Sequence, residues 1–186
     1  MNYRMNESPI GAVYIHIPFC VKKCNYCDFL SFSHGRNAGT AMTQYVQALI
    51  AELALAAQAR TIFIGGGTPS ILPEALLEEL LAAVEHYFVT DALQEYTIEM
   101  NPGTITPQKL QLMHRHGINR LSIGVQSDNA AQLQLLGRIH TFGEAQSAVQ
   151  MARAAGFQNI NLDFMNSGTD SLVTMSSGTS TLYNIT

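Results

Sequence analysis

The chain has 186 residues, of which 47% are apolar and 13% are charged, and its formal net charge is −4. This length suits one domain, or slightly more, that can bury a core without disulfide or metal cross-links. The mildly acidic balance argues against binding to a nucleic-acid backbone, which needs clustered lysine and arginine. No apolar run approaches the ~18 residues of a membrane span. The first residues lack the apolar stretch of a signal peptide, so we expect a cytoplasmic protein.

Short apolar runs alternate with helical patterns along most of the chain. Because these runs are nearly continuous in apolar or β-branched residues, we expect strands that are buried on both faces. The five predicted strands are residues 13–17, 61–64, 96–100, 121–125 and 159–164.

Apolar residues at helical spacing predict four helices between these strands. The predicted helices are residues 42–57, 73–88, 106–117 and 141–156, the last opening on a capping box of Thr141 and Glu144. The order βαβαβαβαβ predicts an α/β fold with a parallel sheet. Right-handed crossovers then place the carboxyl ends of all strands at one edge, which is where ligands bind in barrels and open α/β sheets.

The composition divides the chain into a core and two ends. We interpret residues 1–10 as an N-terminal tail and residues 11–165 as the core domain. Of the last 21 residues, 166–186, ten are Ser or Thr and only Asp170 is charged. This composition predicts a disordered or non-native tail, so the parallel sheet stops after its fifth strand.

The cysteines carry the strongest chemical signal. All three lie within eight residues, with the spacing Cys20-x-x-x-Cys24-x-x-Cys27, on a loop that leaves the first strand. Three thiolates suit an iron–sulfur cluster in which one iron has no protein ligand. Two alternatives stay open: unrelated thiols, and a structural zinc ion. Zinc would need a fourth ligand, for which the candidates are His16, Asp28 and His34.

Polar residues and glycines follow the other strands. Since the strand ends share one edge, these residues are candidates for a single site: Gly65-Gly66-Gly67-Thr68-Pro69, Glu99, Gln126 and Asp163. The first three of these also have an ordinary interpretation. The glycine run is equally typical of a tight turn. Glu99 is equally typical of a solvated acid in a loop, and Gln126 of the residue at the start of a helix. Tyr14 and His16 are typical of residues in the core of a strand.

The segment from Tyr14 to Phe29, YIHIPFCVKKCNYCDF, resembles the signature of the radical S-adenosylmethionine (SAM) superfamily. More narrowly, it is similar to the oxygen-independent coproporphyrinogen oxidase group and its haem-chaperone relatives of the HemW type. The resemblance implies an open (βα)6 barrel, of which this chain supplies about five strands and four helices. It implies that Cys20, Cys24 and Cys27 bind three irons of a [4Fe–4S] cluster, while SAM chelates the fourth. An electron from such a cluster cleaves SAM to methionine and a 5′-deoxyadenosyl radical.

The same resemblance implies which residues contact SAM. Gly66, Gly67 and Thr68 match the segment that holds the methionyl amino group. Glu99 matches a SAM contact, Gln126 and Arg138 match the ribose and methionyl contacts, and Asp163 is a further match. Tyr14 and Tyr26 match positions that line the SAM site.

Two departures from the family pattern affect the expected function. Phe29 stands where the oxidases have a fourth cysteine, which favours a haem chaperone over a coproporphyrinogen dehydrogenase. After Asp163, the family's Gly-Leu-Pro-Gly segment is replaced by Asn166-Ser167-Gly168-Thr169, so the resemblance covers residues 10–165.

Three functions stay open. The first is the N-terminal part of a HemW-like chaperone whose partners are haem, haem-receiving proteins and a reductant for the cluster. The second is an enzyme that oxidises coproporphyrinogen, and the third is an inactive truncated fragment.

Overall fold

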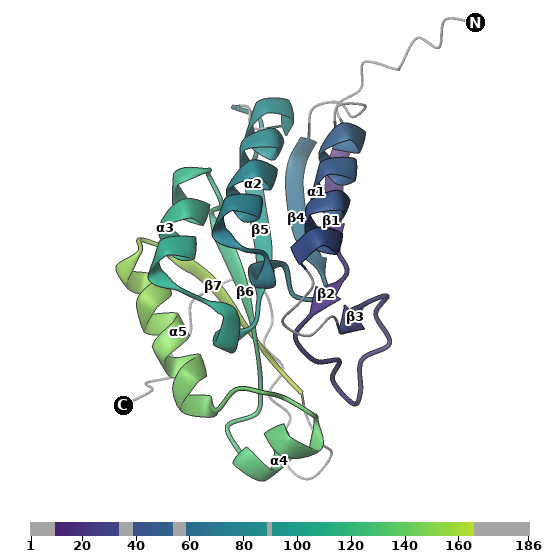
Figure 1. Cartoon of the computed structure of the whole chain (residues 1–186). Helices are drawn as coiled ribbons and strands as arrows, with labels where there is room; N and C mark the ends of the chain where they lie inside the picture. The colour runs from purple at the N-terminus through teal and green to yellow at the C-terminus, as the bar shows by residue number, and fades with distance from the viewer. Residues whose placement is uncertain (1–9, 34–38, 54–58, 89–90, 166–186) are drawn as a thin grey trace, which may run out of the picture.

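The computed structural model describes residues 10–33, 39–53, 59–88 and 91–165 (Figure 1). Its centre is a five-stranded sheet in the order β1-β4-β5-β6-β7, in which every neighbouring pair is parallel. This confirms the predicted α/β class and parallel sheet. The strands are β1 (Ile10–Ile17), β4 (Ala59–Gly66), β5 (Glu95–Met100), β6 (Arg120–Gln126) and β7 (Asn159–Phe164), and a separate two-stranded sheet pairs β2 (Phe19–Cys20) with β3 (Phe32–Ser33).

The long helices cover one face of the sheet. Figure 1 shows α1, α2, α3 and α5 in front of the strands, and they pack on one another in that order. None of the described helices is long and apolar enough to cross a membrane. The helices are α1 (Gly39–Leu53), α2 (Glu74–Phe88), α3 (Pro107–Arg115), α4 (Ala130–Leu135) and α5 (Phe142–Ala154), with 3-10 turns η2 (Pro69–Ile71) and η3 (Pro102–Thr104).

The sequence did not predict helix α4. It has only six residues, which is too short to display a helical period. Its start is fixed by the side chain of Asn129, which accepts hydrogen bonds from the backbone N–H groups of Ala131 and Gln132. Helix α4 lies at the end of the molecule toward which the strands of the main sheet point (Figure 1).

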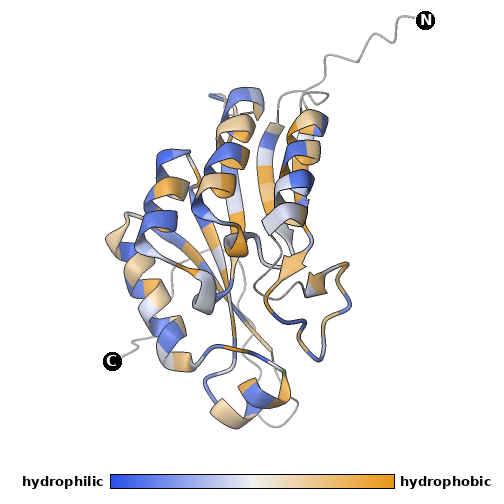
Figure 2. Ribbon diagram, viewed as in Figure 1, coloured by the Kyte–Doolittle hydropathy of each residue, from blue (hydrophilic) through white to orange (hydrophobic). Residues whose placement is uncertain are grey.

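The two faces of the sheet differ in chemistry. The expectation of strands buried on both faces is confirmed in the middle of β5 and β6, where residues 96–98 and 121–123 are all buried. It is wrong for β1 and β7, where Tyr14 and Asn159 are exposed. Side chains that point toward the helices are apolar and fully buried, as at Ile62, Ile98 and Leu121. Alternate residues point to the other face and include Glu99 and Ser122. Figure 2 shows bands of both colours along the strands. The reason is that the described helices cover one face only, so the opposite face can carry polar groups.

The predicted start signals of two helices are confirmed. Thr141 and Glu144 form the capping box at the start of α5, with Thr141 Oγ1 accepting from the Glu144 N–H at 3.2 Å. Thr106 caps α3 in the same way through the N–H of Lys109. Of the predicted tails, 1–9 and 166–186 lie outside the described residues, and Ile10 already belongs to β1.

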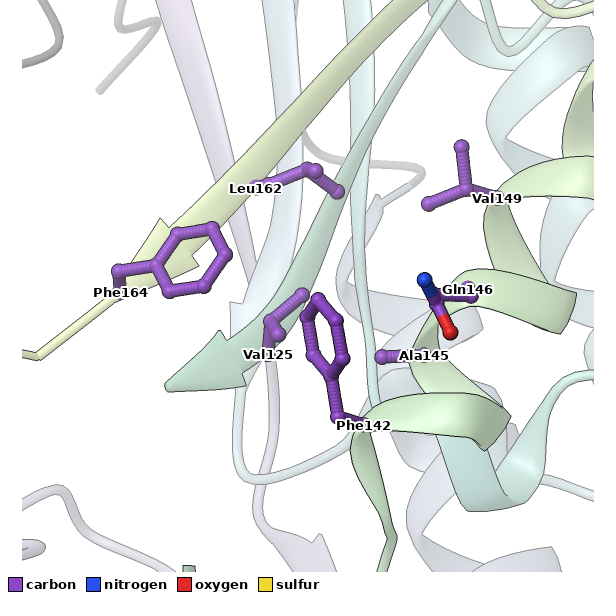
Figure 3. Close-up of a pocket in the computed structure, with 7 residues that line it drawn as sticks. All are labelled: Val125, Phe142, Ala145, Gln146, Val149, Leu162 and Phe164. Carbon is purple, nitrogen blue, oxygen red and sulfur yellow. The ribbon is translucent and has the colours of Figure 1, made fainter. Parts of the chain in front are cut away.

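A small apolar pocket lies between α5 and the last two strands (Figure 3). It is on the helix side of the sheet, whereas the polar residues singled out above lie on the other face or at the carboxyl edge. It belongs to the packing of the edge strand and not to the candidate site. Its lining residues are Val125, Phe142, Ala145, Gln146, Val149, Leu162 and Phe164.

Leu80→Ala tests whether the helix layer stabilises the fold. Leu80 of α2 is 0% exposed, and truncating such a side chain typically lowers the free energy of unfolding by about 2–5 kcal/mol. The matched control is Leu135→Ala, because Leu135 is 75% exposed and such changes stay within about 0.5 kcal/mol. Urea denaturation of the whole chain, followed by circular dichroism, measures both. Equal losses for the two variants would contradict the described packing.

Candidate functional site

The candidate site is organised by the ends of β1 and β4. Beyond the last paired residues of these strands, the N–H of Gly67 donates to Ile17 O and the N–H of Thr68 donates to Phe19 O, both at 2.8 Å. These bonds extend the contact between the two chain segments past the sheet. They hold Cys20, the last residue of β2, directly against the glycine loop.

The three cysteines lie on or beside one loop and are all free thiols. Cys20 is buried, whereas Cys24 and Cys27 are half-buried and share a turn in which the Cys27 N–H donates to Cys24 O at 3.2 Å. The loop returns to the sheet through Leu30, whose carbonyl oxygen lies 2.8 Å from His16 Nε2. The loop is thus fixed at both of its ends.

The kinds of metal site that the sequence left open make different demands on the three thiols. Within the described ranges, no three His, Cys, Asp or Glu side chains are grouped so that they could hold one metal ion. A structural zinc ion needs four ligands around a single point, and His34, one candidate for the fourth ligand, lies outside the described residues. In an iron–sulfur cluster each thiolate binds its own iron, and the sulfur atoms need not meet at one point.

Burial raises the pKa of the Cys20 thiol. A hydrogen bond from Thr68 Oγ1, 3.7 Å from the Cys20 sulfur, acts in the opposite direction, while the charges of Cys27 and Cys24 raise the pKa further. The three thiols are therefore close enough to influence one another. Because the thiolate is the form that binds metal, loading of the site must displace the Cys20 proton.

Gly66 and Gly67 leave no room for a side chain. Gly66 has a φ of +113°, which a residue with a side chain rarely adopts, and a Cβ there would lie 2.6 Å from the His16 ring. A Cβ on Gly67 would lie 2.6 Å from Phe19 O and 3.0 Å from Cys20 Sγ. The glycine run is therefore a point of close backbone approach to the cysteine loop.

Glu99 projects from β5 toward this glycine loop, where its Oε2 accepts the N–H of Gly66 at 3.0 Å. Burial raises the pKa of the Glu99 carboxyl, the Gly66 hydrogen bond lowers it, and the nearby charge of Asp163 raises it again. Glu99 is half-buried on the polar face, so its interpretation as a solvated loop acid is wrong.

A polar network centred on the buried Ser70 supports the loops that follow β4 and β5. Lys109 Nζ donates to Ser70 O at 2.6 Å, and the hydroxyls of Ser70 and Thr104 are 2.5 Å apart. The N–H of Asn101 donates to Ser70 Oγ at 3.2 Å. Burial lowers the pKa of Lys109. Sequence reasoning missed these residues, because Ser, Thr and Lys are usually solvated and only the fold reveals that Ser70 is fully buried.

The side chains of Gln126 and Arg138 both lie beside Gly124, near the end of β6. Gln126 is the last residue of that strand, with a φ of +71°, so it does not enter a helix. Arg138 Nη2 donates to Gly124 O at 2.5 Å and Nη1 lies 3.5 Å from Cys24 Sγ. A Cβ on Gly124 would lie 2.9 Å from Gln126 Nε2 and 3.2 Å from Arg138 Nη2, so the glycine makes room for both side chains.

Asp163 lies on β7, paired in register with Gly124. Its carboxylate accepts from Ser122 Oγ at 2.8 Å and from Asn161 Nδ2 at 2.6 Å. Sequence reasoning missed Ser122 and Asn161. The alternation of polar and apolar residues along β6 and β7 was the signal that could have identified them as neighbours on one face.

The two tyrosines take different positions. Tyr14 is 58% exposed on the polar face, with its hydroxyl 3.0 Å from His16 Nδ1 and its ring stacked on Phe63, so it is not a core aromatic. Tyr26 lies on the cysteine loop, and its pKa is raised chiefly by burial, lowered by Arg138 and raised by Cys24. The structure therefore brings Tyr26 to the end of the site near Cys24 and Tyr14 to the end near Glu99, whose charge also raises the pKa of Tyr14.

The cysteine loop, the glycine loop and the polar strand ends thus form one edge of a parallel α/β sheet. Residues 14–180 match the radical SAM superfamily, and the chain belongs to that superfamily. Membership implies a [4Fe–4S] cluster and bound SAM.

Two of the similar curated proteins carry the name haem chaperone HemW. The protein of Escherichia coli (strain K12) is 42% identical over 168 residues, which is 87% of this chain and 44% of the relative. That of Lactococcus lactis is 38% identical over 163 residues, covering 87% of this chain and 42% of the relative. The chain therefore spans less than half the length of these relatives.

A solved structure also matches the fold. It is coproporphyrinogen III oxidase (HemN) from Escherichia coli, described as a radical SAM enzyme. The match has a TM-score of 0.75 and 31% sequence identity, and covers 87% of this chain and 38% of that chain. The likeness to both groups agrees with the resemblance inferred from the cysteine segment.

Three observations fit the residues to the two implied groups. The donor set consists of three free thiols, the ligands that iron–sulfur clusters use. The glycine loop approaches Cys20 so closely that a Cβ on Gly67 would contact its sulfur. Arg138 Nε is buried and has no hydrogen-bond partner among the described residues, which leaves a cationic donor for an anionic group.

Gly67→Ala tests the close approach of the two loops. The new Cβ would collide with Phe19 O and Cys20 Sγ, so we expect the variant to retain less than half of the wild-type iron after anaerobic reconstitution. The matched control is Gly103→Ala, since the nearest atoms to a Cβ there are 4.0 Å away. Iron and sulfide analysis measures both variants. Wild-type iron content in Gly67→Ala would show that the loops are not held as described.

Proposed function

We propose that this chain is the cluster- and SAM-binding part of a HemW-like haem chaperone. The observation that carries the proposal is the position of Cys20, Cys24 and Cys27 on a loop whose base is hydrogen-bonded to the glycine loop. Three thiolates leave one iron of a cubane cluster open to a non-protein ligand. When bound, the cluster supplies the electron for reductive chemistry on SAM.

In the proposed site, different residues around the thiols bind different parts of SAM. In this proposal the glycine loop and the Glu99 carboxylate receive the methionyl amino group, because an anionic acceptor beside open backbone suits an ammonium group. Arg138 and Gln126 lie on the opposite side, near Cys24, where Arg138 offers its buried Nε–H to the methionyl carboxylate. Asp163, held by Ser122 and Asn161, offers carboxylate oxygens to ribose hydroxyls.

Tyr14 and Tyr26 complete the proposed lining. Tyr14 stacks on Phe63 and presents an exposed ring on the polar face. Tyr26 lies beside Cys24 and Arg138. Aromatic rings at these two ends would exclude water from the bound cofactor while the polar strand residues fix its orientation.

Three cysteines without disulfide bonds are typical of a reducing compartment, so cytoplasmic location is part of the same proposal.

Haem handling is proposed from the names of the HemW relatives. Haem would be the cargo, passed to a haem-receiving protein, and the cluster would need a reductant. Phe29, which replaces the fourth cysteine of the oxidases, is 67% exposed beside an equally exposed Leu30. Both side chains would contact the flat ring of a tetrapyrrole.

The second candidate function is coproporphyrinogen oxidation, and the structural match to the Escherichia coli oxidase supports it.

Anaerobic reconstitution of the whole chain tests the proposal. We expect about four irons per chain, as in a [4Fe–4S] cluster, and loss of the cluster in Cys24→Ser but not in Ser33→Ala. Haem titration of the reconstituted chain should give a saturable spectral change, and coproporphyrinogen should remain unconverted. Less than one iron per chain in a folded protein would refute the cluster assignment. Conversion of coproporphyrinogen would refute the chaperone function and favour the oxidase function.

Glu99→Gln tests the proposed amino-group contact. Since the folded-state pKa of Glu99 is raised, its carboxylate accepts a proton at a higher pH than an exposed glutamate does. SAM affinity of the wild type should therefore be full above this pKa and fall as the pH drops through it. The variant should bind SAM about tenfold more weakly at neutral pH, the size of one charged hydrogen bond, and lack that pH step.

Equilibrium dialysis with labelled SAM on the reconstituted chain measures this dependence. Glu95→Gln is the matched control, because Glu95 lies on the same strand and face but contacts Thr97. If Glu99→Gln kept the wild-type pH profile, Glu99 would not be the group that receives the amino group.

A further inference from the structure

Arg138 makes an arrangement of contacts that SAM binding alone does not explain. It lies in the connection between α4 and α5, half-buried at the carboxyl edge of the sheet. Its Nη2 donates to Gly124 O at 2.5 Å and its Nη1 donates toward Cys24 Sγ at 3.5 Å. Two of its nitrogen atoms are therefore already engaged, one by backbone and one by a cysteine sulfur, while Nε stays available for another group.

The contact between Arg138 and Cys24 is one of several contacts between the cysteine loop and the segment that follows α4. Asn25, the residue after Cys24, donates its backbone N–H to Leu136 O at 3.0 Å and its side-chain Nδ2 to Leu135 O at 2.8 Å. Gly137 follows with a φ of +73°, and a Cβ there would lie 2.9 Å from Asn25 Oδ1. These contacts hold the cysteine loop close to the segment that carries Arg138.

A guanidinium beside a metal-bound thiolate has a definite electrostatic effect. The guanidinium stays protonated, so it places a fixed positive charge and an N–H donor on the sulfur. A reduced cluster carries one more negative charge than an oxidised cluster and gains more from that charge and hydrogen bond. Hydrogen bonds to cluster sulfurs are among the factors that set reduction potentials.

We propose that Arg138 is a positioning residue for Cys24 whose N–H···S hydrogen bond raises the reduction potential of the bound iron–sulfur cluster. The inference rests on the proposed cluster at Cys20, Cys24 and Cys27. It gives Arg138 a second role, which operates whether or not SAM is bound. The Nη1–H of the guanidinium serves the sulfur, and the Nε–H remains for SAM.

The test is a redox titration of the cluster in the absence of SAM. The whole chain is reconstituted anaerobically, reduced stepwise with dithionite and followed by electron paramagnetic resonance. In Arg138→Met the ratio of reduced to oxidised cluster at a fixed potential should fall about tenfold, which corresponds to a midpoint lowered by about 59 mV for one electron. Arg138→Lys keeps the charge without the planar fork and should shift the ratio less.

Arg120→Gln is the matched control. Arg120 lies on the same polar face, but its Nη1 donates to Thr97 Oγ1 at 3.3 Å and approaches no sulfur. Its midpoint should equal that of the wild type. An unchanged midpoint in Arg138→Met, at wild-type iron content, would overturn the inference.

If Arg138→Met does not load iron, Arg138→Lys decides the question. A wild-type midpoint in Arg138→Lys would then overturn the inference, whereas a lowered midpoint supports it. Absence of a cluster in the wild type is a different result, because it refutes the proposed function itself.

Discussion

The candidate site depends on the two hydrogen bonds that continue the β1–β4 contact beyond the sheet, from Gly67 to Ile17 and from Thr68 to Phe19. They fix the chain just before Cys20 against the turn after β4. The approach is so close that it requires glycine at position 67. The same turn presents the N–H of Gly66 to Glu99 on the next strand. One local contact thus links the thiol loop, the glycine loop and the acid.

The parallel sheet provides the second constraint, because its side chains alternate strictly between two environments. One face lies beneath the helices and supplies the apolar core. The other face carries Tyr14, Glu99, Ser122 and Asp163 and leads to the carboxyl edge, where the cysteines lie. A functional group placed one residue earlier or later on any strand would enter the core instead. Position in the strand, and not residue type alone, therefore determines which polar residues can take part in the site.

Sequence reasoning predicted the strands, the long helices and the edge of the sheet that carries the site, because apolar period and strand order determine these features. It did not predict the polar face, since Thr97, Ser122 and Asn161 each stand between apolar residues in the predicted strands and were assigned to the core with them. It also missed helix α4, which is shorter than two turns. The partners of Glu99 and Arg138 come from distant segments, and nothing in the local pattern specifies such contacts. The resemblance to radical SAM proteins indicated the residues but not their hydrogen bonds.

In the proposed site, Cys20, Cys24 and Cys27 hold a cluster with one iron open to SAM. Pulsed electron paramagnetic resonance of the reduced cluster, with SAM labelled with ¹⁵N at its amino group, tests this most directly. We expect a nitrogen hyperfine coupling of the size produced by a directly bound amine. A reduced cluster that binds SAM and shows no such coupling would contradict it.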